Sequence, residues 1–70
     1  MLQVDISKLN GKSFNDILEV VKHYYDKIKE NEVSFINYNG RTKCAMNYFL
    51  KTINFEKHGK TNMGFEIVFE

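Results

Sequence analysis

The sequence predicts a small α/β domain with a three- or four-stranded mixed sheet and two helices on one of its faces. Three observations predict this class. Short segments alternate apolar and polar residues, as strands do. Longer segments place apolar residues three or four positions apart, as helices do. The length of 70 residues allows a single domain (1–70) with a small core, because so short a chain buries only about 60% of its unfolded surface.

The first predicted element is a strand over residues 2–6, with Leu2, Val4 and Ile6 on one face. A loop follows over residues 7–12, where an Asn-Gly pair marks a turn.

A helix is predicted from Ser13 to about Glu30. The Ser13 hydroxyl is placed to cap the first amides of the helix. One apolar stripe supports the whole length, and it consists of Phe14, Ile17, Val21, Tyr24 and Ile28.

The second half of the chain is predicted as strand, helix and strand. Residues 33–38 are β-branched and aromatic, which favours a strand. Residues 42–53 fit two structures: a strand, if Asn39-Gly40 is a hairpin turn, or a helix capped by Thr42. We favour the helix because of the spacing of Ala45, Met46, Phe49, Leu50 and Ile53.

Residues 54–56 are predicted to open a further extended piece, residues 57–62 a polar loop and residues 65–70 the last strand. The order strand, helix, strand, helix, strand favours parallel pairing through right-handed crossovers.

Charge and cysteine content bear on the cellular compartment and on contact with nucleic acid or membrane. The net charge is only +1, with the two signs interspersed, so no basic block is present to follow a phosphate backbone. A lone Cys44 cannot form an intramolecular disulfide. The first residues lack the pattern of a secretory signal, and the apolar runs are too short for a membrane span. We therefore expect a cytoplasmic protein without membrane contact.

Catalysis and metal binding receive little support. The four glycines form no phosphate-binding loop. Cys44, His23 and His58 match no recurrent zinc spacing, so we expect surface histidines and a buried Cys44. The acidic residues of the predicted helix alternate with lysines, as on a solvated face. We predict a protein that is not an enzyme and that has no catalytic residue, metal or cofactor.

Binding residues are sought among the tyrosines and basic residues. Tyr25, at the edge of the helix stripe, and Tyr38, at a strand end, are candidates for a partner surface, because tyrosine is enriched at interfaces. Arg41 and Lys43, close to Tyr38 in sequence, form the best basic cluster. A second, smaller cluster consists of Lys57, His58 and Lys60. Both clusters are small for a nucleic-acid footprint.

One family resemblance bears on function. The run Val4-Asp5-Ile6-Ser7, the loop to Ser13, the helix and the segment Phe35-Ile36-Asn37-Tyr38-Asn39 resemble STAS and STAS-like domains over residues 2–56. The resemblance implies a signalling module in which Ser13 matches the phosphorylated serine of anti-sigma-factor antagonists. The alternative reading of Ser13 is a plain helix cap.

The leading functional prediction is a non-catalytic, protein-binding regulator. It would be STAS-like, or a small inhibitor that occupies the surface of a partner protein. An inhibitor of phage or mobile-element origin that blocks a host defence enzyme, as anti-CRISPR proteins do, is one alternative. A small nucleic-acid-binding module that uses Tyr38, Arg41 and Lys43 is another. An exposed sheet edge also makes a homodimer a candidate state.

Overall fold

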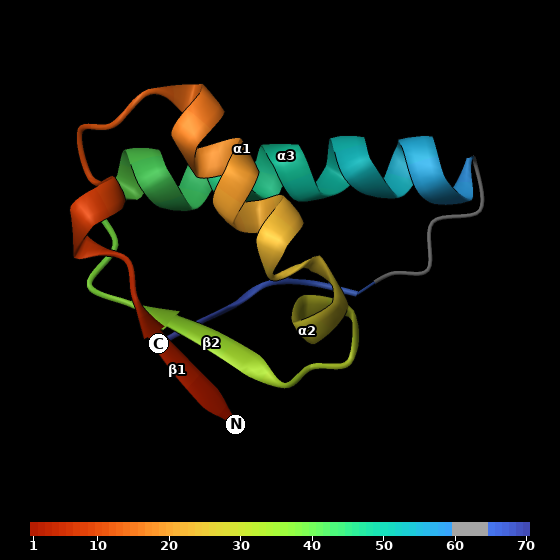
Figure 1. The fold of residues 1–70 in the computed structure, drawn as a ribbon, viewed down its shortest axis with the longest axis horizontal. Helices are drawn as coiled ribbons and strands as arrows, with labels where there is room; N and C mark the ends of the chain where they lie inside the picture. The colour runs from red at the N-terminus through yellow and green to blue at the C-terminus, as the bar shows by residue number, and fades with distance from the viewer. Residues whose placement is uncertain (60–64) are drawn as a thin grey trace.

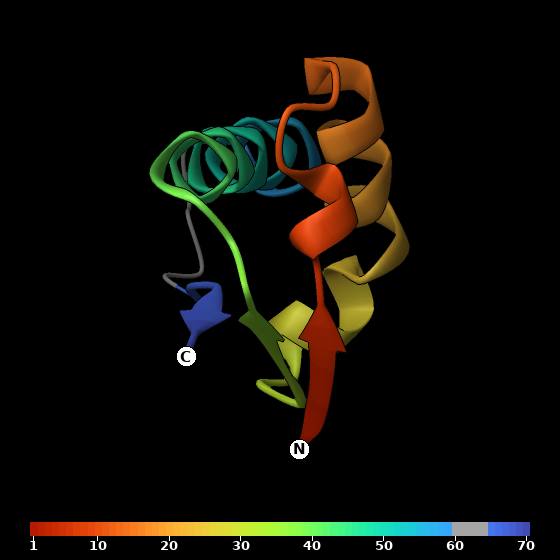
Figure 2. The same cartoon turned by 90° about the vertical axis from the view of Figure 1, so that its left-hand side faces the viewer.

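A computed structural model describes residues 1–59 and 65–70. A three-stranded sheet lies at the bottom of the view in Figure 1, and α1 and α3 lie on the same side of it, as Figure 2 also shows. The elements are β1 (Leu2–Asp5), a short 3-10 helix η1 (Ser7–Leu9), α1 (Phe14–His23), α2 (Tyr25–Lys29), β2 (Val33–Ile36), α3 (Gly40–His58) and β3 (Val68–Phe69). The prediction of a small α/β domain is confirmed.

The sheet has the order β1-β2-β3, and both pairs are parallel. Val4 pairs with Phe35, and Phe35 pairs with Phe69. The expectation of a mixed sheet is therefore wrong for the described strands. Each connection between neighbouring strands passes through helix, and such a crossover returns the chain in the direction of the strand it left.

The predicted helix over residues 13–30 is divided at Tyr24, whose φ and ψ are −96° and 8°. The division changes which side chains enter the core. Tyr25 and Ile28 are buried together with Ile17 and Val21, whereas Phe14, expected in the stripe, is 54% exposed.

Residues 40–58 are helical, which confirms the helix in place of the hairpin strand. The helix is longer than predicted at both ends, and residues 54–56 lie inside it. Its cap is Asn39, whose side chain accepts the Thr42 N–H at 2.8 Å. The Thr42 hydroxyl instead donates to the side chain of Asn10 at 2.8 Å.

Two outer predicted elements differ from the structure. β3 covers only Val68–Phe69, not the whole of 65–70. Leu2, predicted on one face with Val4 and Ile6, is 49% exposed, whereas Ile6 is buried. Of the predicted loop over 57–62, residues 57 and 58 end α3, and residues 60–62 lie outside the described part of the chain.

Polar side chains hold the loops that start α3. Asn37 has a positive φ of 62° and donates from its side chain to Asp5 at 3.0 Å. Asn10 donates to the Asn37 carbonyl and accepts the Asn39 N–H, both at 3.0 Å. The hydrogen bond from the Ser7 backbone N–H, followed by those from the Ser7 hydroxyl and Asn37, lowers the pKa of Asp5. These contacts fix where α3 begins relative to the sheet.

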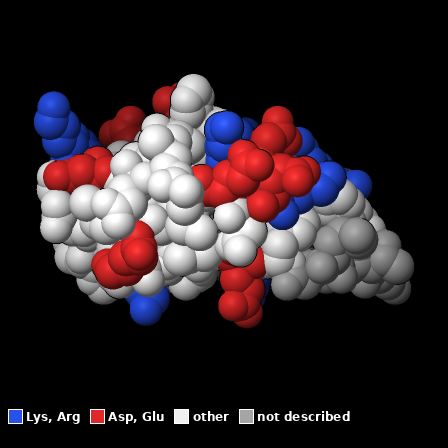
Figure 3. All heavy atoms as spheres, turned by 90° about the horizontal axis from the view of Figure 1, so that it is seen from below, with Lys and Arg blue, Asp and Glu red and all other residues white. Residues whose placement is uncertain are grey.

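The sheet face away from the helices carries a second polar network. Ser34 is fully buried, and its hydroxyl donates to the Glu70 carboxylate, which also accepts from the Gln3 amide at 3.0 Å. Figure 3 shows the molecule from this side, with acidic and basic side chains interspersed among broad areas of other residues. The described residues form no concentrated basic patch on this face.

The Glu70 network predicts a loss of stability in acid. The hydrogen bonds from Ser34 and then Gln3 lower the pKa of Glu70 in the folded protein. The unfolded chain therefore binds more protons, so stability is present above the ordinary glutamate pKa of about 4.3 and is lost as the pH falls below it. Urea midpoints measured between pH 6 and pH 3 are expected to fall less steeply for Glu70→Gln than for the wild type.

The control for this prediction is Glu19→Gln, at an exposed glutamate of α1. It should follow the wild-type pH dependence. If the urea midpoints of Glu70→Gln and the wild type fall equally steeply with pH, the ionised Glu70 side chain does not stabilise the fold.

Candidate functional site

The long helix α3 borders two hollows on the surface of the protein. Its inward stripe packs into the core through Thr42, Ala45, Met46, Leu50, Ile53 and Asn54. The helix has a surplus of positive charge, with four of the ten basic residues, Arg41, Lys43, Lys51 and Lys57, against the single acid Glu56. Because α3 has 19 residues and buries only one stripe, its two flanks remain available for binding.

The first hollow, which we call the aromatic groove, lies between the start of α1 and the first half of α3. It has a volume of about 500 Å³ and is lined by Phe14, Asn15, Arg41, Cys44, Ala45, Tyr48 and Phe49. Most of this lining is apolar, although the groove is open to solvent.

Ring contacts hold the groove in shape. The rings of Phe14 and Phe49 meet edge to face, with centroids 6.3 Å apart, and those of Tyr48 and Phe49 do so at 5.6 Å. The Arg41 guanidinium lies 4.5 Å from the centre of the Phe14 ring and donates to the Lys12 carbonyl at 2.9 Å. Arg41 thus links α3 to the loop before α1 and forms one wall of the groove.

The groove leaves large aromatic side chains in water. Phe14 is 54% exposed and Tyr48 is 65% exposed. Phe55, which is 64% exposed, follows Tyr48 by seven residues, close to two helical turns, so the two lie on the same side of α3. Phe14, Tyr48 and Phe55 form an exposed aromatic surface on and beside the groove.

Cys44 lies in this groove, and its thiol is exposed. The prediction that Cys44 is buried is therefore wrong: its position on the helix places it one residue before the inward-facing Ala45. The residues that line the groove include no histidine. The arrangement thus brings no histidine base to the thiol within the described part of the chain.

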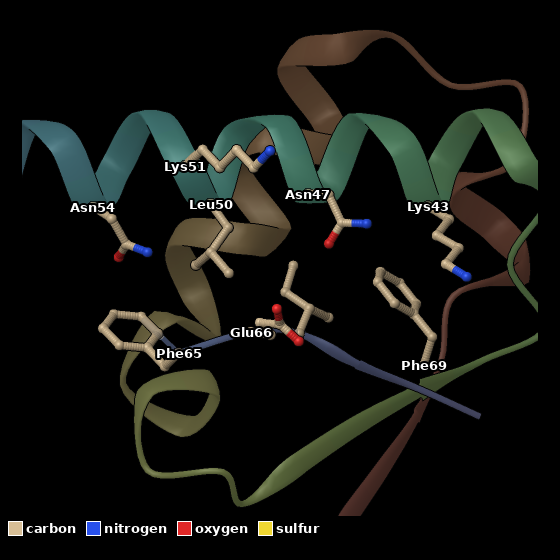
Figure 4. Close-up of a pocket in the computed structure, with 9 residues that line it drawn as sticks. Lys43, Asn47, Leu50, Lys51, Asn54, Phe65, Glu66 and Phe69 are labelled. Atoms are coloured by element: carbon tan, nitrogen blue, oxygen red, sulfur yellow. The ribbon is translucent and has the colours of Figure 1, made fainter. Parts of the chain in front are cut away.

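The second hollow, the α3–β3 cavity, lies between α3 and the last strand and has a volume of about 540 Å³. Figure 4 shows Lys43, Asn47, Leu50 and Asn54 pointing from α3 toward the strand, whereas Lys51 extends along the helix. The helix contributes Lys43, Asn47, Leu50, Lys51 and Asn54, and the opposite wall is formed by Phe65, Glu66, Ile67 and Phe69. The cavity is therefore polar and basic on the helix side and largely apolar on the strand side.

A buried polar network adjoins this cavity. The Tyr25 hydroxyl donates to Asn54 Oδ1 at 3.0 Å and lies 2.9 Å from His58 Nε2. Because a phenol has one proton, His58 donates from Nε2 to the Tyr25 oxygen in this arrangement. Burial, and to a smaller extent the negative charge of Asp26, raises the pKa of Tyr25. Tyr25 therefore stays a hydrogen-bond donor at neutral pH.

The predicted partner-binding residues do not form one surface. Tyr25 is only 4% exposed, so its proposed place on a contact surface is wrong. Tyr38 is half-buried and packs on Phe69 at 4.8 Å. Lys43 lies 5.8 Å from the Tyr38 ring centre and lines the α3–β3 cavity, whereas Arg41 lines the aromatic groove.

The second basic cluster is also divided. Lys57 lies 4.4 Å from the ring centre of Tyr25, and His58 belongs to the buried network. Lys60 lies outside the described residues.

Ser13 caps α1. Its hydroxyl oxygen accepts the Asp16 N–H at 3.3 Å, and its proton is donated to the Asp16 carboxylate at 3.0 Å. The residue is exposed. The cap is confirmed, and phosphorylation of Ser13 stays a prediction.

The sequence pattern does not reveal the exposed aromatic surface. Phe14 fits the helical stripe of residues 13–30, which predicts a side chain that faces the core. Tyr48 and Phe55 lie outside the inward stripe of α3, and a helical projection of residues 40–58 would have shown both on one outer side.

The described residues contain no group of three histidine, cysteine, aspartate or glutamate side chains that could hold a metal ion. Within the same residues, none of the helices has the length and apolar character needed to cross a membrane.

Comparison with known proteins gives no relative. No protein-family model, curated protein sequence or solved structure matches this chain. The resemblance to STAS domains therefore stays a prediction.

Proposed function

We propose that this protein is a non-catalytic regulator that binds a partner protein through its exposed aromatic surface. The observation that carries the proposal is the exposure of Phe14, Tyr48 and Phe55, each more than half accessible, on and beside an apolar groove. Large aromatic side chains gathered in this way are typical of interaction sites.

The energetics favour this use of the surface. A buried aromatic side chain removes roughly 150–250 Å² from water, and each Å² of apolar area contributes about 25 cal/mol. A domain of this size has little folding free energy to spare. The three exposed rings contribute little to that free energy, because they remain in solvent. Burial against a partner would recover that contribution, and the ring contacts of Phe49 already hold Phe14 and Tyr48 in place.

The alternative of nucleic-acid binding has less support. Arg41 and Lys43 line different hollows, and Arg41 already contacts Phe14 and the Lys12 carbonyl. A protein inhibitor and a STAS-like signalling module both remain forms of the proposed regulator, because each would bind a partner surface without chemistry of its own.

The test is capture of a partner from a lysate of the source organism by the immobilised protein. We expect Tyr48→Ser/Phe55→Ser to retain at least about tenfold less of the captured protein, since interface hot spots contribute about 2 kcal/mol or more each. Capture should persist in 0.5 M salt, where the screening length is only about 3–10 Å, because apolar burial is not screened.

The matched control is Leu2→Ser, which removes another exposed apolar side chain, on β1 and away from the groove. It should capture as much as the wild type. Equal capture by the double variant, or complete loss of capture in salt, would refute the proposed surface.

A further inference from the structure

We propose that the α3–β3 cavity binds an extended acidic segment of a partner protein, which adds to the free edge of β3 as a further strand. This inference rests on the proposed function in its broad form, protein binding, but it uses different residues from the aromatic groove. It also specifies the chemistry of the bound segment. Three features carry it: an open strand edge, two lysines of the helix wall at matching axial spacing, and an amide that faces the cavity.

The open edge belongs to β3, which is the last strand in the order β1-β2-β3. The Glu70 N–H donates to the Phe35 carbonyl of β2 at 3.0 Å. Backbone groups of successive strand residues point to opposite sides, so those of Phe69 point away from β2. Nothing in the described part of the chain pairs with that side. Such an edge is a template for another strand.

The helix wall has the charge to select acidic side chains. β3 runs beneath α3, and Lys43 and Asn47 point from the helix toward it (Figure 4). Neither Lys43 nor Lys51 forms an ion pair with any described residue. The two lysines exceed the single acid in the lining, Glu66, so the cavity favours a negatively charged segment.

The spacing of the lysines matches an extended chain. Lys43 and Lys51 are eight residues apart on one helix, a distance of about 12 Å at 1.5 Å per residue. In a strand, side chains four positions apart lie on the same face and are separated by about 13 Å. Eight residues turn a helix about 80° past two full turns, so the two lysines lie on different faces: Lys43 points toward β3, and Lys51 extends along the helix (Figure 4). An acidic residue of an added strand would therefore meet Lys43, and one four positions along would lie level with Lys51 on the helix axis.

The buried amide is that of Asn54, which is only 2% exposed. Its Oδ1 accepts the Tyr25 hydroxyl, and its nitrogen points into the cavity (Figure 4) without a hydrogen bond to any described residue. No buried side-chain nitrogen or oxygen of the described residues lacks a hydrogen-bond partner, so this nitrogen is reached by solvent at the cavity surface. A carboxylate of the bound segment would take the place of water as its acceptor. Asn47, between the two lysines, offers a second amide.

The experiment uses a fluorescein-labelled peptide of eight residues in which glutamate and threonine alternate. We expect it to bind the wild-type protein, as measured by fluorescence anisotropy. The charge-reversal variant Lys43→Glu/Lys51→Glu should bind at least about tenfold more weakly, a change of about 1.4 kcal/mol or more. Lys29→Glu, at an exposed lysine of α2 that does not line the cavity, is the matched control and should bind within about twofold of the wild type.

Two further peptides separate strand addition from charge alone. Replacing the threonines with proline keeps every carboxylate but removes backbone donors, so this peptide should not bind. A peptide of alternating lysine and threonine should not bind either. The proposal would be overturned if the proline peptide bound as tightly as the parent peptide. It would also be overturned if free succinate, which has carboxylates but no peptide backbone, bound as tightly as the parent peptide.

The location is read from amide NMR shifts on adding the parent peptide. Changes should concentrate at residues 65–70 and along residues 43–54 of α3. Changes confined to β1, or no binding at all, would refute this site. The Tyr48→Ser/Phe55→Ser variant should still bind the peptide. If the peptide does not bind but the partner is captured through the aromatic surface, this inference alone is overturned. If the peptide binds but the Tyr48→Ser/Phe55→Ser variant captures the partner as well as the wild type does, only the aromatic surface is overturned.

Discussion

Phe35→Ala is expected to cost about 3–5 kcal/mol of unfolding free energy, which is the usual range for a buried phenylalanine. Phe35 is fully buried in the central strand, and its ring meets those of Tyr24 at 5.6 Å and Phe69 at 6.3 Å. Its removal leaves a cavity between the sheet and the junction of α1 and α2, where Tyr24 lies. Because a domain of this size has only about 4–10 kcal/mol of total stability, the variant should be close to unfolding at room temperature.

Urea unfolding followed by circular dichroism measures this loss. The matched control is Phe55→Ala, at a phenylalanine that is 64% exposed on α3, and its stability should change by no more than about 0.5 kcal/mol. A loss below about 1 kcal/mol for Phe35→Ala would contradict the packing described here. A large loss for Phe55→Ala would instead assign that ring to the fold and remove it from the binding surface.

The second large effect is expected for Tyr25→Phe, with a loss of about 1–3 kcal/mol. The change keeps the buried ring, which packs against Phe65 at 5.7 Å, and removes only the hydroxyl. Asn54 Oδ1, in a side chain that is 2% exposed, then loses its donor, and the hydrogen bond between Tyr25 and His58 is also removed. A buried polar group without a partner costs more than an ordinary hydrogen bond contributes, because its desolvation is not compensated.

A second substitution tests that explanation. Tyr25→Phe/Asn54→Leu replaces both partners with apolar groups, so it should recover part of the stability lost in Tyr25→Phe. Tyr48→Phe, at a tyrosine that is 65% exposed, is the control and should match the wild type. Thermal unfolding of the four proteins distinguishes these outcomes. Equal stability of Tyr25→Phe and the wild type would show that the network contributes nothing.

These two residues also illustrate how far the sequence predicts the site. Phe35 lies in a β-branched, aromatic segment, and its place in a strand follows from local pattern. Tyr25 lies at the edge of the apolar helical stripe, and a residue at that position is expected to be partly exposed at the border of the core. The division of the helix at Tyr24 brings Tyr25 into the core, and the residues that complete its hydrogen bonds are 29 and 33 positions away. Local periodicity contains no information about partners so distant.

The sequence by itself determined the α/β class, the Ser13 cap and the helix over most of 40–58, since these depend on local periodicity and capping. Only the tertiary structure decided that the described strands include no antiparallel pair, that Arg41 and Lys43 line different hollows, and that Phe14, Tyr48 and Phe55 remain in water. The physical reason is that exposure and pairing depend on which elements pack against each other. The proposed binding surfaces are therefore properties of how α3 lies against α1 and β3.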